Sequence, residues 1–537
     1  MNVDFAVIGS SCGGLTAACK AHELGMSAVV LEKCDTLGGG TAFSGGVLWI
    51  PLNHHMIEQG LSDSRDAALE HIRYTSMGRH DEEMLAAYLD RGPEMLRDVE
   101  EITPLRMIAA AAVPDYRDEL PGGSKGGRLL AADPAYMAQL LLDAESQFPL
   151  LSKIRRFPLP LYSAVPLPTN DSRFYIGGRA LIGGLLLGCI KKGIPLLDGT
   201  PAKDLIIENE SVVGVRAQRS GKDFFVKANK GVLLATGGFE WNAAMNKRHL
   251  KVSEIHGITP PGNSGDGHIM GMEAGGAIAL MDLSLYMPTI RIPGEQIDGE
   301  PLFSIFMFNV GQPGNILVNR EGKRCCNECF YPDIGRSFET FDSRRSQSAN
   351  LPVFWIVDQN YRDRIPVGPL PKGTQMAEWL QKGDTVEELA QKLGLPAENL
   401  KGTVERFNRF AKEGLDPDFH RGETGYDKRW AFFPKLKPNP VLGPLEKPPF
   451  YGTQIHVGTV GNLGGLVTNT HGQVLDAQGD PIKGLYATSN TAAPLSTGYA
   501  YTSGMCGGKA MTFGWAAAIH AAGTAKDATK EGTRRGG

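Results

Sequence analysis

Two glycine-rich stretches close to the N-terminus have the residue types needed to hold a dinucleotide. The first is the turn GSSCGG at residues 9–14, which follows an apolar run at residues 5–8. Glycines in such a turn let the backbone approach a pyrophosphate at the N-terminus of a helix. Glu32 comes about 20 residues later, where an acidic side chain can bind the ribose hydroxyls of an adenosine. This spacing predicts dinucleotide binding, with Ser11 in place of the second glycine of the common GxGxxG pattern.

The second stretch, GGGTAFSGG at residues 38–46, indicates which dinucleotide binds. FAD must be held along its pyrophosphate and also beneath its isoalloxazine ring, so a flavoprotein needs a second glycine-rich loop. Thr41 and Ser44 can supply hydroxyl groups in this loop. The glycines that allow close backbone approach are Gly13 and Gly14 with Gly9 in the first stretch, and Gly39, Gly40, Gly45 and Gly46 in the second. The two stretches together predict FAD as the cofactor.

The elements that must position these loops follow from the apolar pattern. Residues 5–8 and 27–31 are short apolar runs typical of buried parallel strands, and residues 15–24 between them have a helical pattern. Residues 231–239 predict a further buried strand that runs into a glycine turn, and residues 203–230 alternate as a β-meander does. The pattern predicts an α/β fold with a Rossmann-like FAD-binding domain.

The composition changes near residue 282, which predicts an inserted domain. Aromatic residues, methionines and prolines cluster from there on, and helical patterns follow near residues 374–392 and 397–413. The predicted division is a first part of the FAD-binding domain at 1–281, an inserted α+β substrate or catalytic domain at 282–449, and a second part of the FAD-binding domain at 450–522. Residues 523–537 are polar and are predicted to form a disordered tail.

Bulk properties exclude several classes of protein. The chain has 537 residues with a formal net charge of −4, and no basic run with interleaved aromatics suggests a nucleic-acid surface. The N-terminus has no signal-peptide pattern, and the longest apolar runs are far shorter than a membrane span. The eight cysteines have no framework spacing, which is typical of a reducing compartment. We therefore expect a soluble, cytoplasmic enzyme.

Cys325, Cys326 and Cys329 include a CxxC spacing, which suggests a metal site or a disulfide. A fourth cysteine or histidine is missing nearby. We therefore predict no metal site, and we interpret these residues as part of a loop.

Several uncommon strings occur along the chain in a fixed order. They are LEK followed by GGGTAFSGGVLWIP, then DYRDELPGG, LLATGGFEWN, NSGDG, GNILVNREGKRCCNE, GGLVTNTHGQVLD, GLYATSN and SGMCGGKAMTFG. With these strings the whole ordered chain resembles the fumarate reductase/3-ketosteroid dehydrogenase flavoprotein family. The resemblance implies a Rossmann-like FAD domain interrupted by a catalytic domain, as the composition also suggests. It further implies that the cofactor contacts include Lys33, Ala235, Gly237, Asp266, Asn490 and Met505.

Within that family, the ketosteroid branch is the more similar. Its members have a tyrosine just after the string that resembles KRCCNE, and Tyr331 stands there with a spacing one residue shorter. Fumarate reductases place an arginine near this point and a His-Thr pair before the double glycine. Here the nearest arginine is Arg336, and Gly461-Asn462-Leu463 precedes the double glycine. Residues 38–46 lack the histidine that carries flavin in succinate dehydrogenases, so FAD is predicted to be noncovalent.

The resemblance implies desaturation of a cyclic ketone next to its carbonyl, foremost of a 3-ketosteroid. Such a reaction needs a base for the α-proton, a hydride acceptor facing the β carbon and donors to the enolate oxygen. The acceptor is N5 of FAD. Tyr331 is the predicted base, with its pKa lowered by hydroxyl donors such as Tyr116. Tyr501 and the backbone N–H of Gly504, at a helix N-terminus, are the predicted oxyanion donors, and Ser503 assists.

The sequence also fits other functions. The form Tyr-x-Ser-Gly at residues 501–504 also fits family members that desaturate a smaller cyclic ketone, such as an oxocyclohexane carboxylate. Arg291 either meets a substrate carboxylate or is a surface arginine. A fumarate-reductase-type ene-reductase and a flavin carrier or sensor without catalysis are the remaining alternatives. Because no nicotinamide, haem or iron–sulfur motif is evident, a desaturase would need an external electron acceptor.

Overall fold

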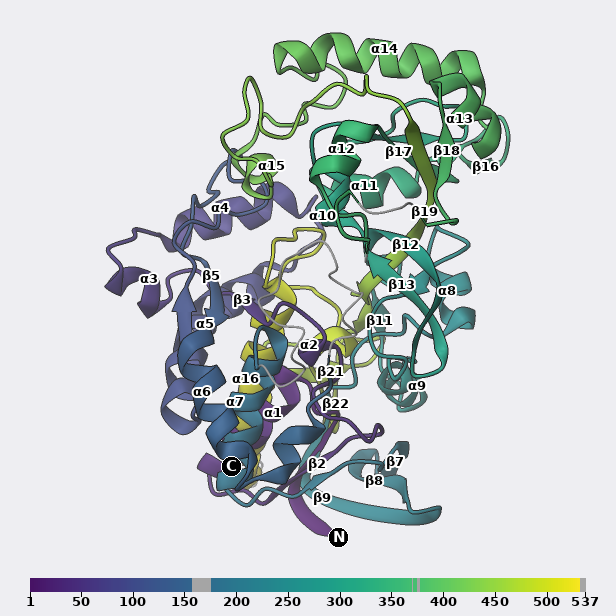
Figure 1. Ribbon diagram of the computed structural model, residues 1–537. Helices are drawn as coiled ribbons and strands as arrows, with labels where there is room; N and C mark the ends of the chain where they lie inside the picture. Colours follow the sequence, from purple (N-terminus) through teal and green to yellow (C-terminus); the bar gives the residue numbers. More distant parts are fainter. Residues whose placement is uncertain (157–174, 369, 374–376, 532–537) are drawn as a thin grey trace.

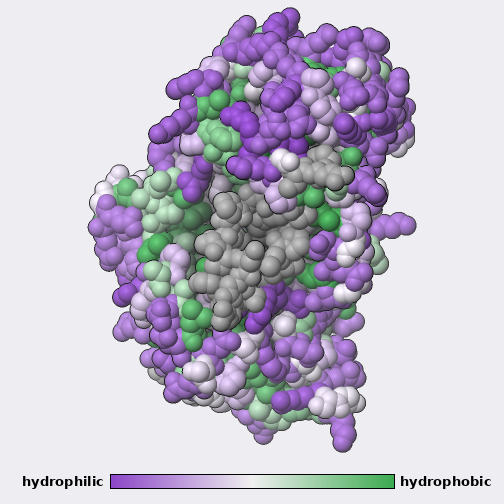
Figure 2. All heavy atoms as spheres, viewed as in Figure 1, coloured by the Kyte–Doolittle hydropathy of each residue, from purple (hydrophilic) through white to green (hydrophobic). Residues whose placement is uncertain are grey.

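The computed structural model describes residues 1–156, 175–368, 370–373 and 377–531. Figure 1 shows a lower lobe that contains the N-terminal and C-terminal parts of the chain, and an upper lobe formed by the middle of the chain. Polar side chains cover much of the outer face of the upper lobe, and apolar side chains gather near the middle of the molecule (Figure 2).

The lower lobe is built on an 8-stranded sheet with the order β21-β22-β8-β9-β1-β2-β6, in which β7 also pairs with β8. Strand β1 lies between β2 and β9 and is parallel to both. The predicted meander is present, because β7, β8 and β9 pair antiparallel in sequence order. The strands are β1 Asn2–Ile8, β2 Ala28–Leu31, β6 Leu196–Leu197, β7 Ala202–Glu208, β8 Ser211–Arg219, β9 Lys222–Leu234, β21 Gln473–Leu475 and β22 Pro481–Ala487.

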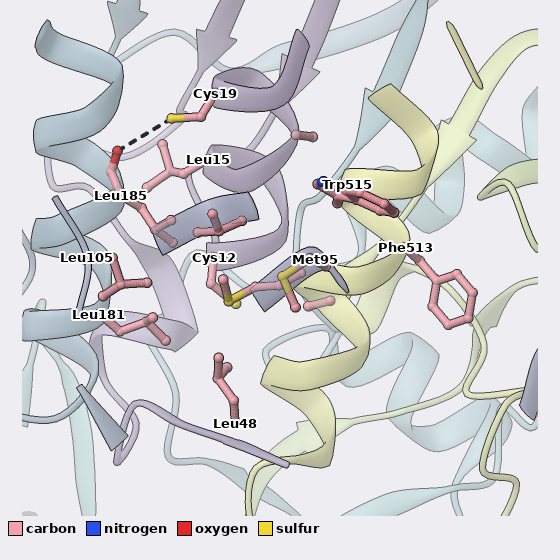
Figure 3. Close-up of a cluster of buried hydrophobic side chains, with 14 of the residues drawn as sticks. Cys12, Leu15, Cys19, Leu48, Met95, Leu105, Leu181, Leu185, Phe513 and Trp515 are labelled. Carbon is pink, nitrogen blue, oxygen red and sulfur yellow. Dashed lines mark hydrogen bonds between the residues drawn. The ribbon is translucent and has the colours of Figure 1, made fainter. Parts of the chain in front are cut away.

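Helices α1, α7 and α16 pack together beside this sheet (Figure 1). Leu15 of α1 and Leu181 and Leu185 of α7 belong to one buried cluster, and the Cys19 thiol donates to the Leu185 carbonyl at 3.8 Å (Figure 3). The helices of this lobe are α1 Cys12–Glu23, α2 Gly39–Ala42, α3 His54–Glu58, α4 Arg65–Thr75, α5 Glu82–Ile102, α6 Pro134–Glu145, η1 Pro149–Lys153, α7 Gly178–Lys191, α8 Ala243–His249, α9 Asp266–Glu273, η3 Ser489–Thr491 and α16 Met505–Glu531.

The upper lobe is built on a 7-stranded sheet with the order β13-β12-β19-β17-β14, in which β10 and β18 also pair with β19. Its strands are β10 His256–Gly257, β12 Ser284–Ile297, β13 Glu300–Ile305, β14 Asn315–Asn319, β17 Val353–Val357, β18 Gln381–Gly383 and β19 Phe450–Asn462. Its helices are α10 Met307–Val310, α11 Tyr331–Phe338, α12 Gln359–Arg364, α13 Val386–Leu393, α14 Ala397–Glu413 and α15 Gly425–Arg429. Smaller sheets pair β11 Ile278–Ala279 with β20 Gly465–Leu466, and β15 Phe341–Asp342 with β16 Gln347–Ser348. The predicted α/β fold with an α+β insert is confirmed.

Two segments differ from the sequence-based division. Strand β19 pairs with β12 and β17, so residues 450–462 belong to the upper sheet and not to the FAD-binding domain, where the sequence pattern places them. A strand's own alternation does not reveal which sheet it joins, and we propose that the insert ends after β19. Helix α16 includes residues 523–531 of the predicted disordered tail. These residues are mostly good helix formers that can extend an existing helix. Residues 532–537 lie outside the described part.

No helix in the described part of the chain combines the length and the apolar character that crossing a membrane would require.

The loop that leads to Tyr116 is anchored by a buried arginine in the lower lobe. Arg128 is 2% exposed and binds both Asp63 at 2.7 Å and Asp115 at 2.9 Å. The Trp49 indole N–H also donates to Asp115, at 2.7 Å. Strands β3 Val47–Trp49, β4 Met107–Ala109 and β5 Leu129–Ala132 form a three-stranded sheet. Trp49 is the last residue of β3, and Arg128 directly precedes β5. The Ser124 N–H donates to Asp115 as well, at 3.0 Å, so the carboxylate of the residue next to Tyr116 is held by three hydrogen-bond donors.

Replacing Arg128 by methionine should destabilise the fold strongly. Asp63 and Asp115 would remain buried without their cation, which typically costs about 3–5 kcal/mol. The free energy of unfolding, measured by chemical denaturation, should fall by that amount. Arg65→Met is the matched control, because Arg65 and its partner Asp90 are 41% and 54% exposed and such pairs contribute about 1 kcal/mol or less. Equal losses in the two variants would refute the anchoring role of Arg128.

Candidate active site

The predicted phosphate turn joins β1 to α1. Ser11 is the N-cap of α1, and its Oγ accepts a hydrogen bond from the Gly14 N–H at 3.4 Å and lies 2.9 Å from the Ser489 Oγ. Gly9 has a φ of +102°, and a Cβ there would lie 2.4 Å from the carbonyl oxygen of Ala235. Only glycine fits this position without strain. Ser11 can replace the usual second glycine because its side chain turns back to cap the helix.

A cavity of about 670 Å³ lies beside this turn, with Glu32 in its wall. The Glu32 carboxylate accepts hydrogen bonds from the Ser10 N–H at 3.1 Å, the Ser10 hydroxyl at 2.7 Å and the Cys34 N–H at 3.0 Å. Because a carboxylate has about four acceptor sites, Glu32 can still accept from a ribose hydroxyl. Lys33 pairs with Asp266 at 2.7 Å in the same wall. The predicted residues lining this cavity are Gly9, Ser11, Glu32, Lys33, Gly39, Gly40, Ala235, Gly237 and Asp266.

A larger cleft of about 2000 Å³, open at its mouth, adjoins the first cavity and receives residues from both lobes. Ser11, Gly40 and Gly237 line both spaces, so one elongated ligand can occupy them together. Thr41 accepts a hydrogen bond from the Cys12 N–H at 3.3 Å, which ties the second glycine loop to the start of α1. The other predicted cofactor residues in its wall are Ser44, Gly45, Gly46 and Asn490.

Three predicted cofactor residues line neither space. Gly13 and Gly14 lie inside α1, where a Cβ would meet the Ala510 carbonyl oxygen at 2.5 Å or the Gly9 carbonyl oxygen at 2.4 Å. Their role in the structure is close packing of α1. Met505 is 1% exposed, and its side chain belongs to the apolar core of the lower lobe.

Four tyrosines from different elements meet in the cleft. Tyr116 lies on the loop between β4 and β5, Tyr331 begins α11, and Tyr501 precedes α16. The hydroxyls of Tyr116 and Tyr331 are 2.9 Å apart. The Tyr116 ring centroid lies 5.6 Å from that of Tyr331, 5.7 Å from that of Tyr501 and 4.6 Å from that of Tyr426. The structure thus brings together the three predicted tyrosines and a fourth, Tyr426, which the sequence analysis missed.

Buried charge pairs hold the segment that precedes Tyr331. Arg324 binds Glu328 at 2.7 Å and Asp416 at 2.8 Å, and all three side chains are almost fully buried. The Glu328 carboxylate also accepts from the Leu317 N–H of β14, at 3.1 Å. The start of α11 is therefore fixed to the upper sheet. The cysteines of this segment are free thiols.

Ser503 and Gly504 line the same cleft at the start of α16. Gly504 has a φ of +91°, and a Cβ there would lie 2.5 Å from the Leu48 carbonyl carbon. No acceptor among the described residues takes the Gly504 N–H. A free N–H at the N-terminus of a long helix can stabilise an anion.

Burial dominates the pKa values of the tyrosines. The pKa of Tyr331 is raised well above its ordinary value of 10.0, mainly by loss of water and further by Tyr116, Tyr501 and Tyr426. The pKa of Tyr116 is also raised by burial, although its hydrogen bond with Tyr331 opposes the shift. The expectation that Tyr116 lowers the pKa of Tyr331 is therefore wrong for this arrangement. The hydrogen bond is present, but Tyr116 and the desolvation of a phenolate both raise the pKa of Tyr331.

Glu240 and Arg429 are charged residues of the cleft wall that the sequence analysis did not single out. Glu240 is 2% exposed, and one carboxylate oxygen accepts from the Asn462 N–H at 3.1 Å. The other oxygen has no hydrogen-bond partner among the described residues, and burial raises the Glu240 pKa to about 7. The signal was an acidic residue two positions after the double glycine of LLATGGFEWN. Tyr426 and Arg429 lie in a segment without any such motif.

Arg291 does not line the cleft in the described structure. Its guanidinium donates to the backbone carbonyls of Ile292, Glu295 and Leu302 at 3.3, 2.8 and 3.1 Å. It links β12 to β13 through these carbonyls, and the idea that it meets a substrate carboxylate is not supported.

Glu240 should make the stability of the protein depend on pH. With a folded pKa of about 7 against 4.5, the folded state keeps a proton that the unfolded state releases between these values. Stability should therefore fall by about 3 kcal/mol as the pH rises from 4.5 to 7, and then level off. Glu240→Gln, which keeps an acceptor for Asn462, should remove that fall in unfolding measurements at pH 5 and pH 8. The exposed Glu254→Gln should not, and an unchanged pH dependence in Glu240→Gln would contradict the shift.

Comparison with known proteins agrees with this geometry. A family model for the FAD binding domain matches residues 4–508. The chain is 39% identical to a 4-oxocyclohexanecarboxylate 2-dehydrogenase of Sinomonas cyclohexanicum, over 97% of this chain and 93% of the relative. It is 36% identical to a 3-oxosteroid 1-dehydrogenase of Mycobacterium tuberculosis, over 97% of this chain and 98% of the relative.

A solved structure shows the same fold. A 3-ketosteroid delta1-dehydrogenase from Sterolibacterium denitrificans, in complex with 1,4-androstadiene-3,17-dione, matches with a TM-score of 0.85 and 32% identity. The match covers 97% of this chain and 100% of that chain. The residues of the two cavities fit FAD, and the chain belongs to the FAD-binding domain family as a FAD-dependent oxidoreductase.

Proposed function

We propose that this protein desaturates a cyclic ketone next to its carbonyl group. The observation that carries the proposal is one cleft lined by both the second glycine loop and the Tyr116–Tyr331 hydroxyl pair, whose oxygens are 2.9 Å apart. A proton-transfer group thus faces the place where a flavin ring is to be held. The proteins similar to this chain include dehydrogenases of an oxocyclohexane carboxylate and of 3-oxosteroids, which supports this reaction class.

FAD fits the two contiguous cavities. Glu32 would bind the adenosine ribose, and the turn at Gly9 would cover the pyrophosphate. Thr41 and Ser44 would hold the isoalloxazine end of FAD. Bound FAD supplies the acceptor for a hydride from the β carbon of the substrate. We infer noncovalent attachment, because no histidine stands in the second glycine loop.

Tyr331 is the proposed base for the α-proton. Its hydroxyl bonds the Tyr116 hydroxyl at 2.9 Å, so a deprotonated Tyr331 would receive one stabilising donor there. Because burial raises its pKa, only a small share of Tyr331 is ionised at neutral pH. The Tyr331 phenolate is therefore a strong base that is present in only a small share of the molecules. The rate of flavin reduction is expected to follow this share.

Tyr501 and Gly504 are the proposed donors to the ketone oxygen. Both line the cleft beside Tyr116, and the Gly504 N–H lies at the N-terminus of α16. Donors that point at the oxygen stabilise the enolate more than the ketone, which lowers the barrier to loss of the α-proton. Ser503 stands beside them and is proposed to assist.

Two substrate classes fit the cleft. A 3-ketosteroid is the first, supported by the likeness to a steroid dehydrogenase over the full chain length. A smaller cyclic keto acid is the second, and the observation that favours it is the cationic Arg429 in an otherwise largely apolar wall. Either reaction leaves two electrons on the enzyme, so we propose a separate electron acceptor.

Anaerobic mixing of the FAD-loaded protein with ketones tests the reaction. A saturated 3-ketosteroid or 4-oxocyclohexanecarboxylate should bleach the visible flavin band, and the product should contain one new double bond next to the carbonyl. If neither ketone bleaches the band while the reduced protein is reoxidised by an enoate, the protein is a reductase. If no ketone reduces the oxidised flavin and no enoate reoxidises the reduced flavin, only a carrier or sensor remains.

Tyr331→Phe should slow flavin reduction by about 10²–10⁴-fold, the usual contribution of a positioned acid–base group. In the unaltered protein the rate should increase with pH through neutrality and up to at least pH 10, because the pKa of Tyr331 is raised above 10.0. Single-turnover kinetics across this pH range measures both effects. Tyr361→Phe is the control, since Tyr361 is a buried tyrosine of α12 that bonds Asn309 at 3.0 Å and does not line the cleft. A rate independent of pH would exclude Tyr331 as the base.

A further inference from the structure

Among the described residues, the cleft wall contains one carboxyl side chain and one guanidinium side chain. Glu240 lies with Gly237 and Asn462, next to the loops that are to hold FAD. Arg429 is the only cationic side chain that the described residues contribute to this wall, which is otherwise rich in aliphatic and aromatic groups. Arg429 is exposed, so both solvent and a ligand in the cleft can reach its guanidinium.

The guanidinium of Arg429 has no acidic partner among the described residues. One of its nitrogens donates to the Ala112 carbonyl at 2.8 Å, and its centre lies 5.1 Å from the ring of Trp430. Although the side chain is exposed, loss of part of its hydration lowers its pKa, and the nearby Tyr426 opposes this shift. Since an arginine has five N–H donors, most of the guanidinium N–H groups are available to a ligand.

Arg429 is also well placed relative to the tyrosines. It lies three residues after Tyr426 in α15, and residues at this spacing share one face of a helix with Cβ atoms about 5–6 Å apart. The Tyr426 ring contacts the Tyr116 ring at 4.6 Å, and Tyr116 bonds Tyr331. The cation is thus about one helical turn from the cluster that is proposed to act on the ketone.

We propose that Arg429 binds a carboxylate of the substrate, remote from its ketone, so that the substrate class is an anionic cyclic ketone. This inference rests on the proposed desaturation and deepens it. Arginine suits the task because its planar fork can donate two parallel hydrogen bonds to a carboxylate. The carboxylate belongs either to a single-ring keto acid or to a 3-oxosteroid with an acidic side chain.

Binding of a ligand that cannot be oxidised tests the inference apart from the reaction. The probes are 4-hydroxybenzoate, which has a phenol oxygen opposite a carboxylate, and its uncharged methyl ester. Both are titrated into the FAD-loaded protein while the flavin absorption spectrum is recorded. The protein should prefer the acid, and Arg429→Gln should reduce the ratio of acid to ester affinity by about 10- to 100-fold. Arg429→Lys should restore part of this ratio.

Arg409→Gln is the matched control. Arg409 is an exposed arginine of α14 whose guanidinium lies 4.7 Å from the neighbouring Phe410 ring, much as Arg429 lies beside Trp430. Arg409 does not line the cleft, so the affinity ratio should stay at its original value in this variant. A ratio that falls equally in both variants, or in neither, would overturn the role of Arg429.

Turnover measurements distinguish the single-ring keto acid from the 3-oxosteroid acid as the source of the carboxylate. If 4-oxocyclohexanecarboxylate is oxidised with a lower KM than its methyl ester, and Arg429→Gln abolishes this difference, the single-ring acid is the substrate class. The same result with a 3-oxosteroid acid and its ester assigns the steroid acid. Turnover of neutral ketones with equal KM values for acids and esters would keep the proposed desaturation and reject carboxylate recognition. Failure of every ketone, with intact selectivity for 4-hydroxybenzoate, would reject only the desaturation.

Discussion

The close contact between the start of α1 and the helix α16 is the constraint on which the site depends. A Cβ at Gly13 would lie 2.5 Å from the Ala510 carbonyl oxygen, and one at Gly514 would lie 2.4 Å from the Gly13 carbonyl oxygen. Two helices can approach this closely only where side chains are absent. The contact places the phosphate turn, at the N-terminus of α1, and Gly504, at the N-terminus of α16, on the same cleft. The packing of these two helices thus positions both the turn that is proposed to bind FAD and the Gly504 N–H that is proposed to bind the enolate oxygen.

Removal of water from the tyrosine cluster is the second determining effect. Tyr116, Tyr331 and Tyr426 are all buried, and burial raises the pKa of each. The same desolvation that keeps the phenols protonated strengthens the hydrogen bonds they make to any charge that develops nearby. The cluster is therefore suited to stabilise an enolate, and a phenolate base in it is strong but scarce.

The two lobes contribute different parts of the site. The lower lobe supplies the glycine loops, Glu32, Tyr116 and Gly504, and the upper lobe supplies Tyr331 and, from α15, Tyr426 and Arg429. Buried ion pairs hold each contribution in place, with Arg128 behind the Tyr116 loop and Arg324 behind the start of α11. Substrate recognition can then change through α15 without disturbing the loops that hold FAD.

The sequence alone determined the parts of this protein whose chemistry is local. Gly9, Ser11 and Glu32 could be assigned because a strand, a turn and a helix of fixed lengths bring them to one phosphate group, and strings such as LLATGGFEWN identified the family. Tyr116, Tyr331 and Tyr501 could be named only from the resemblance, and their contact needed the structure, since they are far apart in the chain. Only the tertiary structure decided that Tyr426 and Arg429 face the cleft, that Arg291 and Met505 do not, and that the pKa of Tyr331 rises. The reason is that burial and long-range contact depend on the packing of whole elements, which no short pattern of residues encodes.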